Sequence, residues 1–210
     1  MINFFDKIYV ITCTSCQDRR NYIENHLNDK HIKFQFVESW DKSIFSESDV
    51  CAAQKSLISS HIRCILDAKI HRFNNILICE DDAYFVDNFE SELTKFVGVL
   101  PEDWDFIQLG NQIWATHWLR RVQLKENLYR FFWGTGSHGI CIKQSVYDDV
   151  IEIFQTYKSN TDIMYYELFE NKKCYCPENF LIDALSENSH LNYIDHKQIF
   201  KSTMNHKKLT

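Results

Sequence analysis

The chain alternates short apolar runs with longer segments in which apolar residues recur every three or four positions. Short runs are typical of β-strands, and the longer spacing is typical of α-helices. The expected strands are residues 7–12, 32–37, 74–79, 104–110 and 139–142, and the expected helices are residues 18–30, 55–70, 89–100 and 145–157. Strands that alternate with helices predict an α/β domain with a largely parallel central sheet.

Polar residues mark two of the expected helix starts. Ser48 or Asp49 is a candidate N-cap for the helix over 55–70, and Ser145 is one for the helix over 145–157. Short hydroxyl and carboxylate side chains accept hydrogen bonds from the free N–H groups of a first helical turn.

Three consecutive acids, Glu80, Asp81 and Asp82, follow the apolar run 74–79. Ligands of parallel sheets bind beyond the carboxyl ends of the strands, and Mg²⁺ or Mn²⁺ is bound by carboxylates together with substrate phosphates. In an extended segment, Glu80 and Asp82 share one face while Asp81 points elsewhere. The alternative is a cap for the next helix, but Asn88 lies too far along the chain for that. The pattern favours a metal–phosphate site.

The chain has 210 residues and a formal net charge of −6, with 45% hydrophobic and 25% charged residues. These values are ordinary for one globular domain. The acidic balance disfavours a general nucleic-acid-binding surface, which needs basic stripes. We expect one domain over residues 1–195 and a basic tail over residues 196–210, which contains four Lys and no acid. The tail is either a weak peripheral contact for anionic lipid headgroups or a solvated terminus.

The sequence contains no run near the ~18 consecutive apolar residues of a membrane span. The N-terminal segment has Asp6 and Lys7 inside its apolar run and no basic start, so we expect a strand there and no signal peptide. The eight Cys are then expected to be free thiols in a reducing, cytoplasmic compartment.

Cys13 and Cys16 form a C-x-x-C pair between the first expected strand and the first expected helix. This position is typical of thioredoxin-like redox sites, in which a helix N-terminus lowers a thiol pKa. Two ordinary Cys in a βα loop are the alternative. The two Pro residues lack the context of the cis-Pro that faces thioredoxin-like thiols, and the Cys pair at 174–176 is poorly spaced for zinc. The redox and zinc interpretations stay minor alternatives.

Three of the five glycines, Gly134, Gly136 and Gly139, fall within six residues around His138. Such a loop either approaches a ligand closely or contains turns with positive φ. His138 is therefore a candidate third ligand for the metal.

Five motifs, in order, resemble those of the family-25 glycosyltransferases, which include bacterial lipooligosaccharide galactosyltransferases and the collagen galactosyltransferases. They are IYVITCTSCQDRR, SLISSHIRCIL, ILICEDDAYF, WDFIQLG and GTGSHGICIKQSVYDDVI. A closing segment that begins at Asp162 is similar too, so the resemblance runs from about residue 7 to residue 190. Two sites depart from the family pattern: Thr12 and Cys13 replace an Asn-Leu pair, and Gln54 stands where Glu is usual.

The resemblance implies a GT-A-type nucleotide-binding sandwich with a DxD-like metal motif. Glu80 and Asp82 would bind Mn²⁺ or Mg²⁺, with Asp82 the first choice, and the metal would bind the diphosphate of a UDP-sugar. The remaining expected donor contacts are Thr12, Arg19, Ser60, His61 and Asp81. For His61, on the helix over 55–70, a structural role is the alternative. The implied function is transfer of a hexose, galactose or glucose, to a hydroxyl of a glycan, lipooligosaccharide or glycoprotein.

Inverting transfer, which the resemblance implies, needs a general base for the acceptor hydroxyl proton. Asp162 is the first candidate, with an N-cap before Ile163 as its alternative role. Asp183 and Glu178 are the next candidates. The alternative function is a non-catalytic member that binds nucleotide-sugar or glycan, and such a protein would bind the donor without releasing nucleotide.

Overall fold

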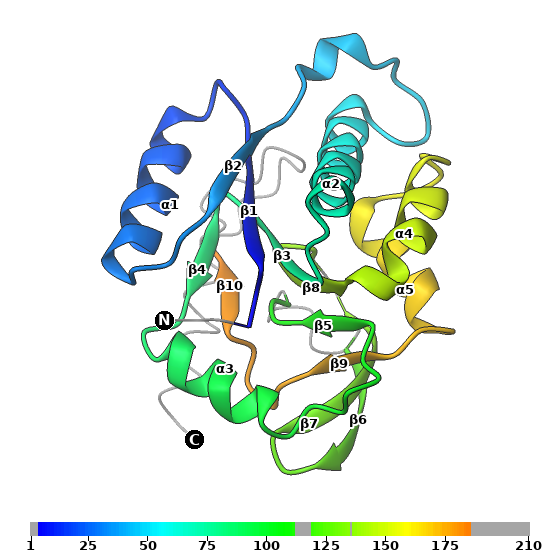
Figure 1. Ribbon diagram of the computed structural model, residues 1–210. Helices are drawn as coiled ribbons and strands as arrows, with labels where there is room; N and C mark the ends of the chain where they lie inside the picture. Colours follow the sequence, from blue (N-terminus) through cyan, green and yellow to red (C-terminus); the bar gives the residue numbers. More distant parts are fainter. Residues whose placement is uncertain (1–3, 112–118, 135, 186–210) are drawn as a thin grey trace.

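The computed structural model describes residues 4–111, 119–134 and 136–185. Within these ranges the chain forms strands, α-helices and two short 3₁₀ helices, labelled η1 and η3 (Figure 1). In chain order they are β1 (Lys7–Thr12), α1 (Gln17–Asp29), β2 (Gln35–Glu38), η1 (Lys42–Ile44), α2 (Ala52–His71), β3 (Asn75–Glu80), β4 (Ala83–Phe85), α3 (Phe89–Val97), β5 (Phe106–Gln108), β6 (Arg120–Lys125), β7 (Leu128–Trp133), β8 (Gly139–Lys143), η3 (Gln144–Val146), α4 (Tyr147–Phe154), α5 (Thr161–Phe169), β9 (Cys174–Cys176) and β10 (Ile182–Ala184).

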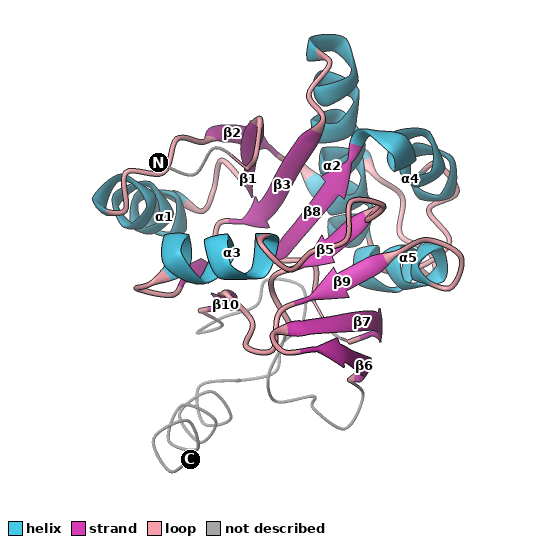
Figure 2. Ribbon diagram, turned by 60° about the horizontal axis from the view of Figure 1, so that its bottom comes forward, coloured by secondary structure: helices cyan, strands magenta, loops and turns pink. Residues whose placement is uncertain are grey.

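Eight strands form one sheet in the order β2-β1-β3-β8-β5-β9-β7-β6, and β10 pairs separately with β4 (Figure 2). β1 pairs in parallel with β2 and β3, and β5 pairs in parallel with β9. Only β8 and β7 run against their neighbours. Six of the eight strands therefore share one direction, which confirms the expected largely parallel α/β sheet.

Helices cover both faces of the sheet (Figure 1). Tyr9 and Ile11 of β1 pack with α2, α4 and α5, whereas Ile8 and Val10 pack with α1, α3 and β4. Successive side chains of a strand point to opposite faces, so a strand covered on both sides needs an unbroken apolar run. This explains why the central strands were recognisable in the sequence.

Helix α2 begins at Ala52, and neither Ser48 nor Asp49 caps it. The carboxylate of Glu47 accepts the hydrogen bond from the Ala52 N–H, at 3.1 Å. The hydroxyl of Ser48 instead accepts a bond from the N–H of Val50, before the helix. The expected cap was wrong because the loop folds back by several residues and presents a more distant side chain.

Ser145 lies in η3, before α4, and its hydroxyl donates to Asp105 Oδ1 at 3.2 Å instead of capping the helix. The apolar pattern also left strands β4, β6, β7, β9 and β10 unpredicted. β6 is mostly exposed at the edge of the sheet and contains three basic residues, so it lacks an apolar pattern.

Within the described ranges, no helix is long and apolar enough to cross a membrane. The tail over 196–210, for which a lipid contact was considered, lies outside the described residues.

Candidate active site

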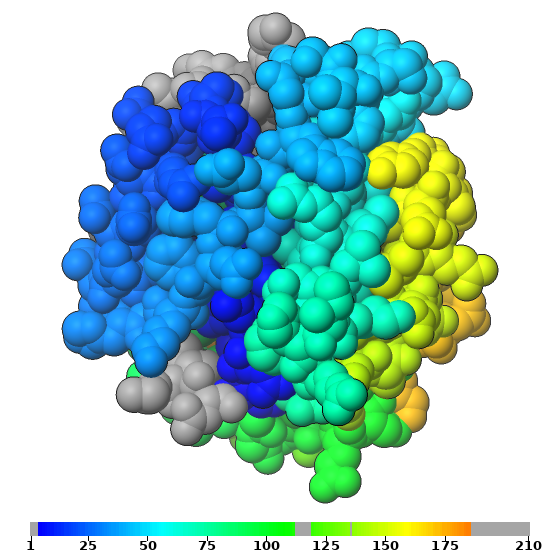
Figure 3. All heavy atoms as spheres, turned by 45° about the horizontal axis from the view of Figure 1, so that its top comes forward, coloured from blue at the N-terminus to red at the C-terminus, as the bar shows by residue number. Residues whose placement is uncertain are grey.

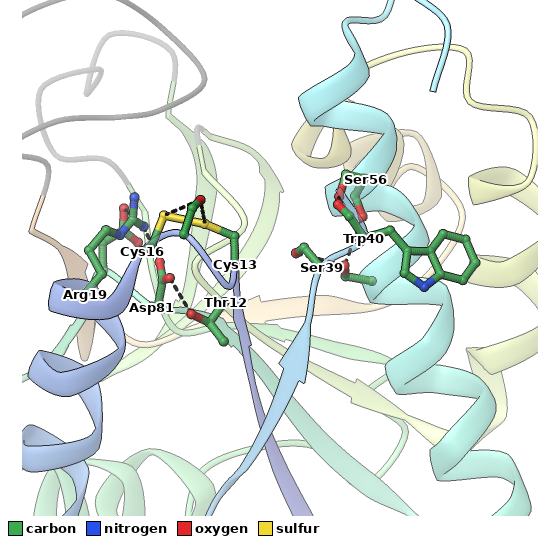
Figure 4. Close-up of a disulfide and its surroundings, with 11 residues drawn as sticks. Thr12, Cys13, Cys16, Arg19, Ser39, Trp40, Ser56 and Asp81 are labelled. Atoms are coloured by element: carbon green, nitrogen blue, oxygen red, sulfur yellow. Dashed lines mark hydrogen bonds and ion pairs between the residues drawn. A yellow bond between two sulfur atoms is a disulfide. The ribbon is translucent and has the colours of Figure 1, made fainter. Parts of the chain in front are cut away.

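A cavity of about 280 Å³ opens at the carboxyl ends of β1 and β3. One wall is the β1–α1 loop, which follows Thr12, and the other is formed by Trp40 and the start of α2 (Figure 4). Glu80 and Asp81 also line the cavity. The position agrees with the rule that ligands of parallel sheets bind beyond the carboxyl ends of the strands.

Arg19, from α1, lies between two of the three acids. Its Nη2 is 2.5 Å from Asp81 Oδ1 and 2.9 Å from Asp82 Oδ2. Asp81 Oδ2 also accepts a hydrogen bond of 2.8 Å from Thr12 Oγ1 (Figure 4). We call Thr12, Arg19, Glu80, Asp81 and Asp82 the acid cluster.

We expected Glu80 and Asp82 to share one face and Asp81 to point elsewhere, and this expectation is wrong. β3 ends at Glu80, and residues 81–82 form a turn, so the strand geometry on which the expectation relied stops before the last two acids. Asp81 and Asp82 therefore reach the same guanidinium, while Glu80 Oε1 accepts a hydrogen bond of 3.1 Å from Ser137 Oγ.

The acid cluster has three carboxylates and one guanidinium. Burial and the charge of Asp82 raise the pKa of Glu80 to about 8, although Arg19 acts in the opposite direction. Burial also raises the pKa of Asp81, against the charge of Arg19 and the hydrogen bond from Thr12. Glu80 is then protonated at neutral pH, and the two carboxylates that share Arg19 leave one net negative charge, which favours the approach of a further cation.

Glu80 and Asp82 fit a hard divalent cation. Asp82 Oδ1 is buried and has no hydrogen-bond partner, so its lone pairs are unused, but Asp82 is not among the residues that line the cavity. No three His, Cys, Asp or Glu side chains of the described ranges are arranged as a ready metal site. Two carboxylates suit Mg²⁺ or Mn²⁺, which commonly complete their coordination with substrate phosphates and water.

His138 is buried near the carboxyl end of β5. A Cβ atom built on Gly110 would lie 2.7 Å from His138 Cδ2, so only glycine leaves room for this ring. Burial lowers the pKa of His138 to about 4, which makes the imidazole neutral, and its Nε2 has no hydrogen-bond partner. His138 therefore does not complete a three-ligand metal site with Glu80 and Asp82 in this structure.

Asp162 lies in the first turn of α5, where Asn160 is the N-cap. The N-cap role considered for Asp162 is therefore wrong. Its Oδ1 accepts a hydrogen bond of 2.9 Å from the N–H of Ile163, and its Oδ2 accepts one of 3.3 Å from the N–H of Gly136. Gly136 has a φ of 92°, a conformation that L side chains rarely adopt. The carboxylate of Asp162 thus fixes the loop between β7 and β8, which we call the glycine loop, at Gly136.

The glycine loop joins Asp162 to the acid cluster. Gly136 binds Asp162, and its neighbour Ser137 binds Glu80. The carbonyl oxygen of Gly136 also accepts a hydrogen bond of 3.0 Å from Gln108 Nε2. We call Gln108, Gly136, His138 and Asp162 the glycine-loop cluster. The sequence did not single out Gln108 or Ser137, although both lie inside quoted motifs, WDFIQLG and GTGSHGICIKQSVYDDVI.

Ser60 and His61 lie on α2 and do not line the cavity. His61 is fully buried, its Nδ1 is 2.9 Å from the hydroxyl oxygen of Tyr165, and burial lowers its pKa to about 3. This is the structural role considered as its alternative. Ser60 donates to Ser39 Oγ at 3.1 Å and to Ser56 O at 2.9 Å, and both partners line the cavity. Ser60 therefore supports the wall from behind.

Cys13 and Cys16 form a disulfide in the β1–α1 loop (Figure 4). The expectation of eight free thiols is thus wrong for this pair, while the other six Cys are free. Both bonded Cys line the cavity, and the bond links the end of β1 to the start of the helix that carries Arg19.

Trp40 is a site residue that the sequence analysis did not select. Trp40 lines the cavity and is 49% exposed, and its ring points away from the disulfide (Figure 4). The ring stacks with Phe45 at a centroid distance of 6.2 Å, and the Arg63 guanidinium is 5.6 Å from its centroid. The available signal was the pair of large aromatic residues, Trp40 and Phe45, in the polar loop over 38–49.

A second hollow, of about 550 Å³, lies between the edge strand β2 and α2, on the face shown in Figure 3. Arg20, Phe36 and Leu66 are among its lining residues. None of the residues that the sequence predicted for the site lines it, so it is separate from the acid cluster.

Solved structures of a glycosyltransferase and of a pyrophosphorylase share this fold. A glycosyltransferase involved in the glycosylation of the major capsid of PBCV-1 matches 87% of this chain and 94% of its own, with 9% identity and a TM-score of 0.53. A UDP-glucose pyrophosphorylase, solved with UDP-glucose, matches 82% of this chain and 73% of its own, with 9% identity and a TM-score of 0.50. These likenesses define the fold as GT-A-type.

The family follows from the sequence. The family model described as "Glycosyltransferase family 25 (LPS biosynthesis protein)" matches residues 5–164, a range that contains the acid cluster, His138 and Asp162. The chain belongs to glycosyltransferase family 25 and is a glycosyltransferase. No curated protein sequence matches it.

Proposed function

We propose that this protein transfers a hexose from a UDP-sugar to a hydroxyl group of a glycan or glycoprotein, with inversion and with a divalent metal. The observation that supports the proposal is the meeting of Arg19 with two carboxylates at a cavity formed by the ends of β1 and β3. Galactose and glucose are the sugars that the family resemblance favours.

The cavity has separate regions for the two ends of a nucleotide diphosphate. The wall formed by Ser39, Trp40 and the start of α2 lies across the cavity from Arg19, so the nucleoside is placed on that side (Figure 4). The diphosphate lies toward Arg19 and the acids, where positive charge can contact phosphate oxygens. The disulfide between Cys13 and Cys16 holds the loop that separates these regions.

Glu80 and Asp82 are the proposed metal-binding residues, with the buried Asp82 Oδ1 the first ligand. A bound Mg²⁺ or Mn²⁺ would stabilise the negative charge that develops on the departing diphosphate. Asp81 has another task, because both of its oxygens are already bound to Arg19 and Thr12. It orients the guanidinium toward the phosphates.

Asp162 is the proposed general base. Its hydrogen bonds to two backbone N–H groups fix the orientation of the carboxylate beside the glycine loop. In the transition state it accepts the proton of the acceptor hydroxyl as that oxygen attacks the anomeric carbon. The next candidates are less suitable: Asp183 is buried in β10, and Glu178 is exposed after β9.

The test is nucleotide release from UDP-galactose and UDP-glucose in the presence of a glycan acceptor, with Mn²⁺ and then with EDTA. We expect acceptor-dependent release of UDP that EDTA abolishes. A matched pair of variants locates the effect: Asp82→Asn should lose release, while Asp87→Asn, an exposed acid five positions further on, should keep it. Donor binding without release for every acceptor would instead establish a non-catalytic binding protein.

A further inference from the structure

The β6–β7 hairpin presents large apolar side chains to solvent at the edge of the sheet. Val122 is 57% exposed, Leu124 is 53% exposed and Phe132 is 37% exposed, and β6 is the last strand of the sheet order. Of the seven large apolar side chains that are exposed in the described ranges, three belong to this hairpin. Single exposed apolar residues are normal, but a group on one element indicates a contact surface.

The two faces of the hairpin differ. Phe131 is fully buried against the core that contains α5, so one face is covered by the protein. On the other face, Val122 lies opposite Arg130, whose guanidinium is 5.0 Å from the Phe132 ring centroid. Register shifts occur near both ends of the strand pair, and such bulges redirect side chains away from regular alternation. Leu128, at the turn end of β7, is buried in the core that contains α3, so the open part of the second face is limited to Val122, Leu124 and Phe132.

The hairpin is basic although the protein is acidic. Residues 119–134 contain four basic residues and one acid, Glu126, in a chain of net charge −6. Arg120 and Lys125 are exposed at the two ends of β6 and flank the apolar side chains. A further acid, Glu178, lies at the turn, where its N–H donates to Asn127. The local surplus is positive, opposite in sign to the chain as a whole.

We propose that the open face of the β6–β7 hairpin docks the protein on an anionic membrane surface. Val122, Leu124 and Phe132 enter the boundary between headgroups and acyl chains, and Arg120 and Lys125 contact the lipid phosphates and carboxylates. A patch that combines apolar and basic side chains matches an anionic lipid interface in both respects. β7 leads directly into the glycine loop, so docking would hold that end of the site near the membrane. This inference does not depend on the proposed reaction.

The first test is cosedimentation of the full chain with vesicles of phosphatidylcholine alone or mixed with phosphatidylserine. We expect binding to the mixed vesicles only. Arg120→Gln combined with Lys125→Gln should weaken this binding about fivefold for each charge removed. The control is Lys207→Gln combined with Lys208→Gln in the basic tail, which should bind like the wild type. Loss of binding in the tail variant with full binding of the hairpin variant would overturn the proposal.

The second test addresses the apolar contact. Val122→Ser combined with Leu124→Ser should weaken vesicle binding, while Leu66→Ser combined with Ile70→Ser, two exposed apolar residues of α2, should not. Circular dichroism and thermal unfolding check that each variant is folded. Absence of wild-type binding to the mixed vesicles would refute membrane docking. A wild-type dimer that only the hairpin variant dissociates, without vesicle binding, would assign the face to self-association instead.

Discussion

The acid cluster and the glycine-loop cluster meet at Ser137 but differ in charge and in origin. The acid cluster has two carboxylates on one guanidinium with Glu80 beside them, and its members come from the ends of two adjacent parallel strands and from α1. The glycine-loop cluster has one carboxylate, Asp162, beside neutral groups such as His138. The first arrangement suits a ligand that brings a cation and phosphates, and the second suits the transfer of one proton.

The largest expected effect is in the glycine-loop cluster. Asp162→Asn should lower turnover by about 10²- to 10⁴-fold while donor affinity stays nearly unchanged, because a base acts on the acceptor proton only in the transition state. Turnover is measured by nucleotide release and affinity by calorimetry. The matched control is Asp148→Asn, an exposed acid in the first turn of α4. Full turnover of Asp162→Asn would move the base to Asp183 or Glu178.

The acid cluster should respond to loss of its internal cation. Arg19→Gln leaves Asp81 and Asp82 without a counter-charge, so we expect the free energy of unfolding to fall by about 2 kcal/mol in metal-free buffer, less than for a fully buried pair. Mn²⁺ should restore part of this loss, because a divalent cation replaces the missing charge. The control is Arg20→Gln, whose partner Glu38 is half exposed, and which should cost under about 1 kcal/mol. A Mn²⁺ effect of equal size in both variants would contradict the account.

His61 lies outside both clusters, so it should affect stability and not chemistry. Its pKa is lowered from 6.5 to about 3, so the folded protein holds it neutral while the unfolded chain binds a proton below pH 6.5. The contribution of neutral His61 to the free energy of unfolding is therefore complete above pH 6.5 and is lost as the pH falls toward 3. In urea titrations across this range, the wild type should lose up to about 1.4 kcal/mol per pH unit more than His61→Leu. Parallel stability curves for the two proteins would show that His61 is protonated when folded.

The smallest effect on turnover is expected at the cavity rim. Cys13→Ser combined with Cys16→Ser removes a disulfide that closes a very short loop, which limits its contribution to about 2 kcal/mol. Thermal unfolding should therefore shift modestly, and nucleotide release should stay close to that of the wild type. Loss of turnover in a folded variant would give the sulfur atoms a direct role and favour the redox interpretation.

The sequence predicted the acid cluster better than the glycine-loop cluster for a physical reason. β1 and β3 are buried on both faces, so their apolar runs reveal where each strand ends and which charges follow. The contacts of Asp162 with Gly136 and of Ser137 with Glu80 join residues 26 and 57 positions apart, and no local pattern records such contacts. The turn at 81–82 was missed because alternation holds only within a strand.

Motif residues also proved to have different roles. Ser60 and His61 matched the same helix motif, yet Ser60 supports the cavity wall and His61 fills the core beside Tyr165. Their positions on α2 could be predicted from the sequence. The burial of each side chain could not, because it depends on how α5 packs against α2.

The central claim is that the acid cluster binds the donor through a divalent cation. Calorimetric titration of a UDP-sugar into wild type and into Asp82→Asn, each with Mn²⁺ and with EDTA, tests it most directly. The account predicts tight binding only for the wild type with Mn²⁺, and weak binding that is insensitive to EDTA for the variant. Equal wild-type affinity in Mn²⁺ and in EDTA would contradict the claim and leave Arg19 as the phosphate-binding cation.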